Sequence, residues 1–370
     1  MKAEVIIEGL SRAISLADKA TGKNLSLPLL ANVFLGAKDN KITVRATNLE
    51  VGIEITINAR VSQSGTAVVK GSILNSFLSH LSGKDKVALS LNNDNLTITT
   101  PTNSATIKSY PSGDFPTLPT IKTSETLELP AEDLIGGLRA VWYAASTSGI
   151  KPEINSVYWH QSGVDLVLAA TDSFRLAEKK INLSPTNIKG LSLIVPARNT
   201  LEIIRSFENQ TGSVAVSFDK NQLVIVGGEI YFTTRLIDGN FPDYQQIIPR
   251  QHETEVVILR QDWVNALKLA NIFADKLSKI SLNIDPKQQK IELMSRDSEI
   301  GNQESQLTAT ITGDPVTVSL NARYLLEAMT SLMANTINLK LNGANKPVIM
   351  TGVGDASFTY LIMPLLNPAL

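Results

Sequence analysis

A strand-corner-strand motif that recurs along the chain constrains the fold more than any other feature. Residues 166–177 read Leu-Val-Leu-Ala-Ala-Thr-Asp-Ser-Phe-Arg-Leu-Ala. The apolar run has the length of a strand, Thr-Asp-Ser is typical of a tight turn, and the residues after it predict a second strand. Weaker versions of this corner surround Asn48 and Asp297. Aligning Asn48, Asp172 and Asp297 gives spacings of about 124 and 125 residues, which indicates three copies of a whole domain.

A second marker has the same period. Pro116, Pro242 and Pro364 each follow an alternating, strand-like segment, and they are about 126 and 122 residues apart. Two independent markers with one period make a chance repeat a poor explanation. The predicted boundaries fall in short polar linkers and give domains over residues 1–122, 123–249 and 250–370.

Each copy shows the same order of expected elements: a strand, a helix, several strands, a second helix and several more strands. The expected helices cover residues 11–20, 72–81, 131–145, 197–208, 262–277 and 322–334. In the first of them, Ala13, Leu16, Ala17 and Ala20 form one apolar face. The strands expected between the two helices of the third copy cover residues 279–284, 290–295 and 306–312. This order predicts α+β domains, each with two helices packed on antiparallel sheet.

Composition places the chain among ordinary globular proteins. Its 370 residues are 43% hydrophobic and 19% charged, which suffices for two or three packed domains. The absence of cysteine excludes disulfides, thiolate metal sites and a cysteine nucleophile. The N-terminal residues lack the apolar core of a signal peptide, and no apolar run approaches the ~18 residues of a membrane span. We therefore expect a cytoplasmic protein.

No constellation in the sequence indicates catalysis. The histidines, His80, His160 and His252, match no metal or triad spacing, and no phosphate-binding loop or nucleophile elbow occurs. We expect no enzyme activity, no metal and no cofactor. A hydrolase built on a repeated α+β fold stays open as an alternative, because buried carboxylate pairs leave no sequence signature.

Basic residues recur on the expected helices, although acidic residues share them and the net charge is −1. A solvated helix face would explain this pattern without any function. The repeat supports another explanation, because three copies leave a free sheet edge at each end of the chain. If the first copy of one chain pairs with the third copy of another, two chains can close a ring. Lys and Arg on helices lining the hole would then face a polyanion, and the alternative is a ring-shaped scaffold without nucleic acid.

Several motifs occur in one order along the whole chain. They are Leu27-Pro28, Ala-Thr-Asp-Ser-Phe-Arg-Leu-Ala at 170–177, Val195-Pro196, Phe-Pro-Asp-Tyr at 241–244 and Tyr-Leu-Ile-Met-Pro at 360–364. Together they resemble the bacterial DNA polymerase III beta subunit family, the replicative sliding clamps. The resemblance implies a non-enzymatic processivity factor in DNA replication. It also implies three clamp-type domains that form half of a closed ring, with a head-to-tail homodimer encircling duplex DNA.

The resemblance further implies partners that present a short peptide to a hydrophobic pocket between the second and third copies. These partners are the replicative DNA polymerase, the clamp loader and other proteins with a clamp-binding motif. The pocket residues carried over by position are Thr171, Phe174, Arg175, Leu176, Pro242, Gln246, Ile247, Pro347, Leu361, Met363, Pro364 and Leu365. Phe174 replaces the family's usual histidine and Gln246 a common arginine, so an altered motif preference is expected. For each residue alone, ordinary core packing is the alternative.

The resemblance also assigns two further sets of residues. The DNA-facing set is Lys23, Asn24, Lys70, Arg139, Lys151, Arg198 and Arg205. Asn24 stands where the family often has an arginine, with Lys23 beside it as a substitute. The dimer-interface set is Ala105, Ile107, Ile272 and Phe273. Helical spacing alone leaves Ile272 and Phe273 equally compatible with a core position.

Overall fold

The computed structural model describes residues 1–22, 27–81, 83, 85–121, 126–183 and 190–365. The chain forms two compact units. Unit 1 comprises the described residues of Met1–Ile135 and Arg198–Asp238, and unit 2 comprises those of 136–197 and 239–365. The predicted central copy therefore contributes to both units.

The predicted element order occurs three times along the chain. The first copy contains β1 (Lys2–Ile6), α1 (Ile7–Lys19), β2 (Asn32–Lys38), β3 (Lys41–Thr47), β4 (Val51–Asn58), β5 (Arg60–Gln63), β6 (Gly65–Lys70), α2 (Gly71–Ser79), β7 (Lys86–Asn92), β8 (Asn95–Thr99) and β9 (Ser104–Tyr110). The second contains β10 (Thr126–Pro130), α3 (Ala131–Val141), β11 (Ser156–Ser162), β12 (Asp165–Thr171), β13 (Arg175–Asn182), β14 (Ser192–Pro196), α4 (Ala197–Phe207), β15 (Ser213–Phe218), β16 (Gln222–Gly227) and β17 (Ile230–Arg235). The third contains β18 (Thr254–Leu259), α5 (Arg260–Ile272), β19 (Lys279–Asp285), β20 (Lys290–Asp297), β21 (Gly301–Thr308), β22 (Thr310–Gly313), β23 (Val316–Asn321), α6 (Ala322–Ala328), β24 (Thr336–Leu341), β25 (Val348–Gly352) and β26 (Asp355–Ile362).

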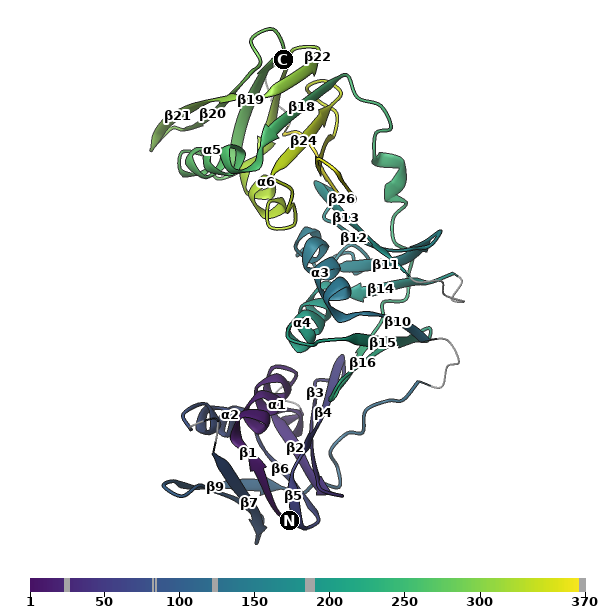
Figure 1. Cartoon of the computed structure of the whole chain (residues 1–370), viewed down its shortest axis with the longest axis vertical. Helices are drawn as coiled ribbons and strands as arrows, with labels where there is room; N and C mark the ends of the chain where they lie inside the picture. Colours follow the sequence, from purple (N-terminus) through teal and green to yellow (C-terminus); the bar gives the residue numbers. More distant parts are fainter. Residues whose placement is uncertain (23–26, 82, 84, 122–125, 184–189, 366–370) are drawn as a thin grey trace. The chain divides into compact units, whose positions relative to one another are not determined.

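One antiparallel sheet carries unit 1. Its strand order is β10-β15-β16-β17-β4-β3-β2-β6-β9-β8-β7-β1-β5, and β17 joins the second copy to β4 of the first. Helices α1 and α2 pack against each other and against the strands of the first copy (Figure 1). Ile7, Leu10, Ile14 and Ala17 of α1 are buried, as expected for residues spaced three and four apart.

Two antiparallel sheets form unit 2. The larger has the order β14-β11-β12-β13-β26-β25-β24-β18-β22, and the smaller has the order β21-β20-β19-β23. Here β13 of the second copy pairs with β26 of the third. Helices α5 and α6 pack against each other (Figure 1), and α5 also covers β20 and β21. The same type of strand pairing thus joins consecutive copies in both units.

The corner that revealed the repeat has the same hydrogen bonds in all three copies. The side-chain Oδ1 of Asn48, Asp172 and Asp297 accepts backbone N–H groups two and three residues later, at 2.7–3.2 Å. Leu49 and Ser173 occupy the following position in the first two copies, and both have φ = 76°. The spacing of these residues was therefore a correct guide to the duplication.

Several predicted element boundaries were wrong. Helix α5 ends at Ile272 instead of residue 277, and α6 ends at Ala328 instead of residue 334. Strand β21 begins at Gly301, and β23 was missed between residues 312 and 322. Arg260 holds the segment that follows α6, because its guanidinium donates to the carbonyl oxygens of Met329 and Leu332, both at 2.7 Å. No helix of the described residues has the length and apolar character needed to cross a membrane.

Candidate partner-binding site

Arg175 is the central side chain of the β12–β13 corner in unit 2. It is 8% exposed, and its Nε donates to Asp172 Oδ2 at 3.0 Å. Its Nη2 donates to the carbonyl oxygen of Tyr143 at 2.7 Å, and its Nη1 donates to Glu327 of α6. The guanidinium carbon also lies 4.1 Å from the centre of the Tyr324 ring. Arg175 therefore ties the corner to elements of both the second and the third copies.

An open cavity of about 660 Å³ lies beside this corner. Of the predicted pocket residues, Phe174, Met363, Pro364 and Leu365 line it. The residues that sequence reasoning missed there are Ser173, Lys276, Leu277, Ser278, Asn321, Arg323, Tyr324 and Asn345. The cavity wall contains large exposed apolar groups, because Phe174 is 61% exposed and Leu277 is 64% exposed.

An apolar cluster continues from the cavity through Met363. Leu176 of β13 and Leu361 of β26 face each other across the strand pair and are buried together with Ala169 and Tyr244. Met363 packs against this cluster and also lines the cavity. Its backbone N–H donates to the carbonyl oxygen of Phe174 at 2.8 Å, which fixes the end of β26 to the corner. Cluster and cavity together provide adjacent apolar surfaces at the end of the β13–β26 pair.

A group of hydrogen-bonded polar side chains lies beside the cluster. The buried Tyr244 hydroxyl donates to Glu178 Oε2 at 2.6 Å and lies 2.9 Å from His160 Nε2. A phenol has one proton to donate, so His160 Nε2 must be the donor toward Tyr244. The His160 ring stacks on Tyr158, which in turn stacks on Phe241. Burial lowers the pKa of His160 below its ordinary 6.5, and burial together with Glu178 raises the pKa of Tyr244.

The remaining predicted pocket residues lie outside the cavity lining, at three different places. Thr171 is buried, and its hydroxyl donates to the carbonyl oxygen of Arg175 at 2.6 Å, so it shapes the turn. Pro242, Gln246 and Ile247 are exposed on the segment that follows β17, where Gln246 donates to Asp243 at 2.6 Å. Pro347 is half-buried just before β25 and does not line the cavity.

The equivalent corner of unit 1 has different residues at the paired positions of its two strands. There β4 and β17 pair Gly52 with Thr233, where the unit 2 corner pairs two leucines. A Cβ atom on Gly52 would lie 2.4 Å from Leu118 Cδ2, so a larger side chain does not fit without a shift. The neighbouring cavity, of about 360 Å³, thus lacks the aliphatic pair that makes the unit 2 corner suitable for apolar groups.

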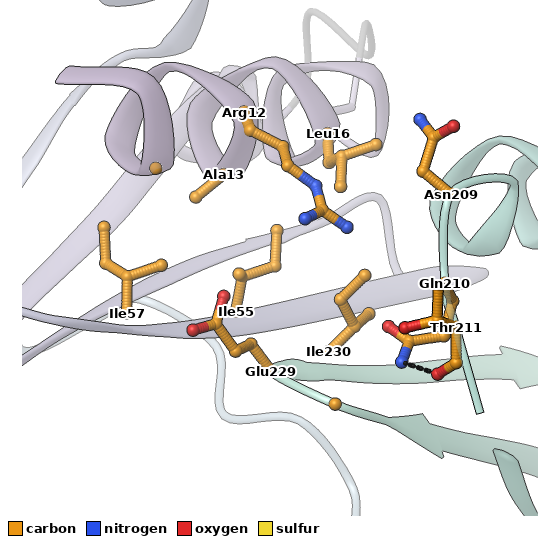
Figure 2. A pocket seen from close by; sticks show the side chains of 12 residues that line it. Arg12, Ala13, Leu16, Ile55, Ile57, Asn209, Gln210, Thr211, Glu229 and Ile230 are labelled. Carbon is orange, nitrogen blue, oxygen red and sulfur yellow. Dashed lines mark hydrogen bonds between the residues drawn. The ribbon is translucent and has the colours of Figure 1, made fainter. Parts of the chain in front are cut away.

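Another cavity in unit 1, of about 270 Å³, lies between α1 and strands β4 and β17. Figure 2 shows Arg12 and Leu16 extending from α1 above a floor of Ile55, Ile57 and Ile230. Leu16 is only half-buried there, although the sequence places it on the buried face of the helix. Among the described residues, no group of three or more His, Cys, Asp or Glu side chains could hold a metal ion.

Comparison with known proteins identifies the family. Models of the DNA polymerase III beta subunit match along the chain: the N-terminal domain over residues 1–119, the central domain over 128–243 and the C-terminal domain over 245–366. The chain belongs to the DNA polymerase III beta subunit family. This family consists of sliding clamps, which are non-catalytic processivity factors. The family assignment therefore decides against the hydrolase alternative.

Individual members of the beta subunit family match over nearly the whole chain. The beta sliding clamp of Synechococcus elongatus is 30% identical over 362 residues, or 96% of each chain. That of Staphylococcus aureus is 26% identical over 94% of each chain. Among solved structures, the DNA polymerase sliding clamp of Bacillus subtilis has a TM-score of 0.93 at 23% identity over 99% of both chains. The sliding clamp of Pseudomonas aeruginosa bound to griselimycin has a TM-score of 0.94 at 22% identity, covering 99% of this chain and 100% of that chain.

The residues predicted from the beta subunit family to face DNA are surface residues wherever the structure describes them. Lys70, Arg139, Lys151, Arg198 and Arg205 are exposed. Arg205 donates to Glu202 at 2.8 Å on the same helix. Lys23 and Asn24 lie outside the described residues. The assignment of this set to DNA stays a prediction.

The residues predicted to form the dimer interface lie on two elements. Ala105 and Ile107 belong to β9, where Ala105 is half-buried and Ile107 is 9% exposed. Ile272 is the last residue of α5 and Phe273 follows it. Ile272 is 61% exposed, so it is no core residue of the single chain. Its exposure is what the predicted interface requires, and the interface stays a prediction.

Proposed function

We propose that two copies of this chain close head to tail into a ring that encircles duplex DNA and tethers the replicative polymerase. The observation that carries the proposal is the repeated joint between copies. Strand β17 pairs with β4, and the equivalent β26 pairs with β13. The remaining strands of these two types are β9 in the first copy and β21 in the third. A β9–β21 joint between chains would repeat the two joints within the chain.

Both strands have free edges in the described chain. Residues 104–108 of β9 pair with β8 on one side, and among the described residues of β9 Ser109 and Tyr110 pair with β6. Strand β21 pairs with β20 over its whole length, and no other described strand pairs with it. Exposed edges of this kind invite pairing with another chain. Because one edge belongs to the first copy and the other to the third, two molecules that pair head to tail can satisfy both edges by closing a ring.

The surface beside β21 supports a joint at this place. Leu269 and Ile272 of α5 are 51% and 61% exposed, and α5 packs on β21. A cavity of about 670 Å³ lies next to these strands. A second chain that paired with β21 would cover these exposed apolar side chains of α5.

Within this proposal, the exposed Lys and Arg residues of the predicted DNA-facing set contact phosphates. Such contacts do not depend on sequence, which is what a sliding protein needs. The cavity and apolar cluster of unit 2 bind the peptide of the polymerase, of the clamp loader and of other partners. We place this function in the cytoplasm. We also keep the domain boundaries at residues 1–122, 123–249 and 250–370 as a prediction.

Retention on DNA of different topology tests the function. The protein is loaded onto a nicked circular plasmid by the clamp loader of the same organism with ATP, and free protein is then removed by gel filtration. We expect the protein to stay on the circle and to leave after a single restriction cut, because a ring slides off an open end. Equal retention before and after the cut would instead indicate a surface-bound protein, and absence from the circle would contradict encirclement.

A further inference from the structure

The charged residues that line the unit 2 cavity indicate the kind of partner peptide that it favours. In the described chain, the charged residues that line the cavity are Lys276 and Arg323, and both are cations. Both side chains are exposed, and no ion pair with a described residue engages either of them. Phe174, Leu277 and Met363 contribute an apolar wall to the same cavity.

Acidic residues on the corner, the loop and the helix that carry the cavity residues are engaged in other contacts. Asp275 Oδ1 accepts the backbone N–H groups of Leu277 and Lys279 at 2.9 and 3.0 Å, within the loop that carries Lys276. Asp172 and Glu327 both accept hydrogen bonds from the buried guanidinium of Arg175. These three acids are thus held by groups of the fold, whereas Lys276 and Arg323 form no ion pair with the part of the chain that the structure describes.

We infer that the cavity prefers partner peptides that carry Asp or Glu side chains next to their apolar anchors. This inference rests on the proposed function of the cavity as the peptide site. An apolar anchor occupies the wall of Phe174, Leu277 and Met363, and flanking carboxylates pair with Lys276 and Arg323. Phe174 contributes no charge, so the preference arises from the two cations that line the cavity. Exposed pairs of this kind change affinity by about two- to fivefold each, and added salt weakens them.

The test compares three fluorescent peptides of equal length that share Leu and Phe anchors. The first is amidated at its C-terminus and has two flanking Asp residues. The second is also amidated and has Asn in both places, and the third has Asn and a free C-terminal carboxylate. Binding is measured by fluorescence anisotropy at about 0.05 M and about 0.5 M salt. We expect the Asp peptide to bind about four- to twentyfold more tightly than the amidated Asn peptide at low salt, with the difference shrinking at high salt.

The protein variant is Arg323→Gln with Lys276→Gln. It should lose most of the preference for the Asp peptide, measured as the ratio of its affinities for the Asp and the amidated Asn peptides. Lys287→Gln removes an exposed cation that lies outside the cavity and should keep the full preference. An unchanged preference in the double variant would overturn the inference, as would equal binding of the Asp and amidated Asn peptides to the wild type. A gain only for the free C-terminal carboxylate would also overturn it, because the bound acid would then be the chain end.

Failure of the proposed function gives a different result. Met363→Asp places a charge where the cavity meets the apolar cluster. If the cavity is the peptide site, this substitution weakens even the amidated Asn peptide by more than about tenfold. Unchanged binding of that peptide to Met363→Asp would refute the site itself. Loss of binding to Met363→Asp without any Asp preference would refute only the charge inference.

Discussion

Replacing Arg175 by alanine should destabilise unit 2 strongly. The guanidinium is buried and donates to Asp172, to Glu327 and to the carbonyl oxygen of Tyr143. Its removal leaves two carboxylates close together without their shared cation. Breaking a buried ion pair from one side costs about 3–5 kcal/mol. The Glu327 side chain is 38% exposed, so water screens part of its loss, and we expect about 3 kcal/mol.

The chain offers a selective probe for this prediction. Its three tryptophans, Trp142, Trp159 and Trp263, all belong to unit 2, so their fluorescence reports the unfolding of that unit. For a urea slope of about 2–3 kcal/mol per molar, a loss of about 3 kcal/mol lowers the midpoint by about 1 M or more. Lys287→Ala removes an exposed positive charge from the same unit and should change the free energy of unfolding by less than about 0.5 kcal/mol.

A second substitution separates charge from geometry at this site. Arg175→Lys keeps the positive charge, but one ammonium group cannot reproduce the forked contacts to three partners on different elements. Its midpoint should lie between those of the wild type and Arg175→Ala. If the midpoint of Arg175→Ala coincides with that of Lys287→Ala, Arg175 does not join the second and third copies, and the reasoning is wrong.

The hydrogen-bonded group of His160, Tyr244 and Glu178 beside the apolar cluster gives two further predictions. The native state lowers the pKa of His160, so below about pH 6.5 the unfolded chain binds more protons and stability falls with decreasing pH. His160→Gln can keep a donor toward Tyr244 without titrating, so its stability should depend less on pH between about pH 5 and 7 in urea unfolding, and an unchanged slope would exclude His160. Tyr244→Phe leaves the buried Glu178 without its hydroxyl donor and should cost about 1–3 kcal/mol in the same assay at neutral pH. A variant as stable as the wild type would show that water replaces the hydroxyl.

Local chemistry explains why the duplication could be read from the sequence. Asn48, Asp172 and Asp297 each close a turn through their own side chain, so the residue type and the turn are directly linked. The alternating strands and the amphipathic helices followed from side-chain periodicity in the same way. The resemblance to the family placed Phe174, Met363 and the residues after it at a pocket, and the structure brings these residues to one cavity.

Contacts distant in sequence explain what was missed. Leu277 and Tyr324 share the cavity with Phe174 although about 100 to 150 residues separate them in sequence, and no local pattern records this proximity. Helix α6 ends earlier than its periodicity suggests, and Arg260 of α5, distant in sequence, binds the carbonyl groups of Met329 and Leu332 in the segment that follows it. Strand β21 is rich in Asn, Gln, Glu and Ser and was placed too late, since pairing with β20 and not its own composition makes it a strand.

Sedimentation of the wild type and of a joint variant tests the central claim most directly. The chain has a mass of 40.1 kDa, so a closed two-membered ring sediments at about 80 kDa. The substitutions Ile272→Ala and Phe273→Ala remove apolar groups at the end of α5 and should give particles of about 40 kDa that are still folded. A wild type of about 40 kDa, or a variant that stays at about 80 kDa, would contradict a ring closed at this joint.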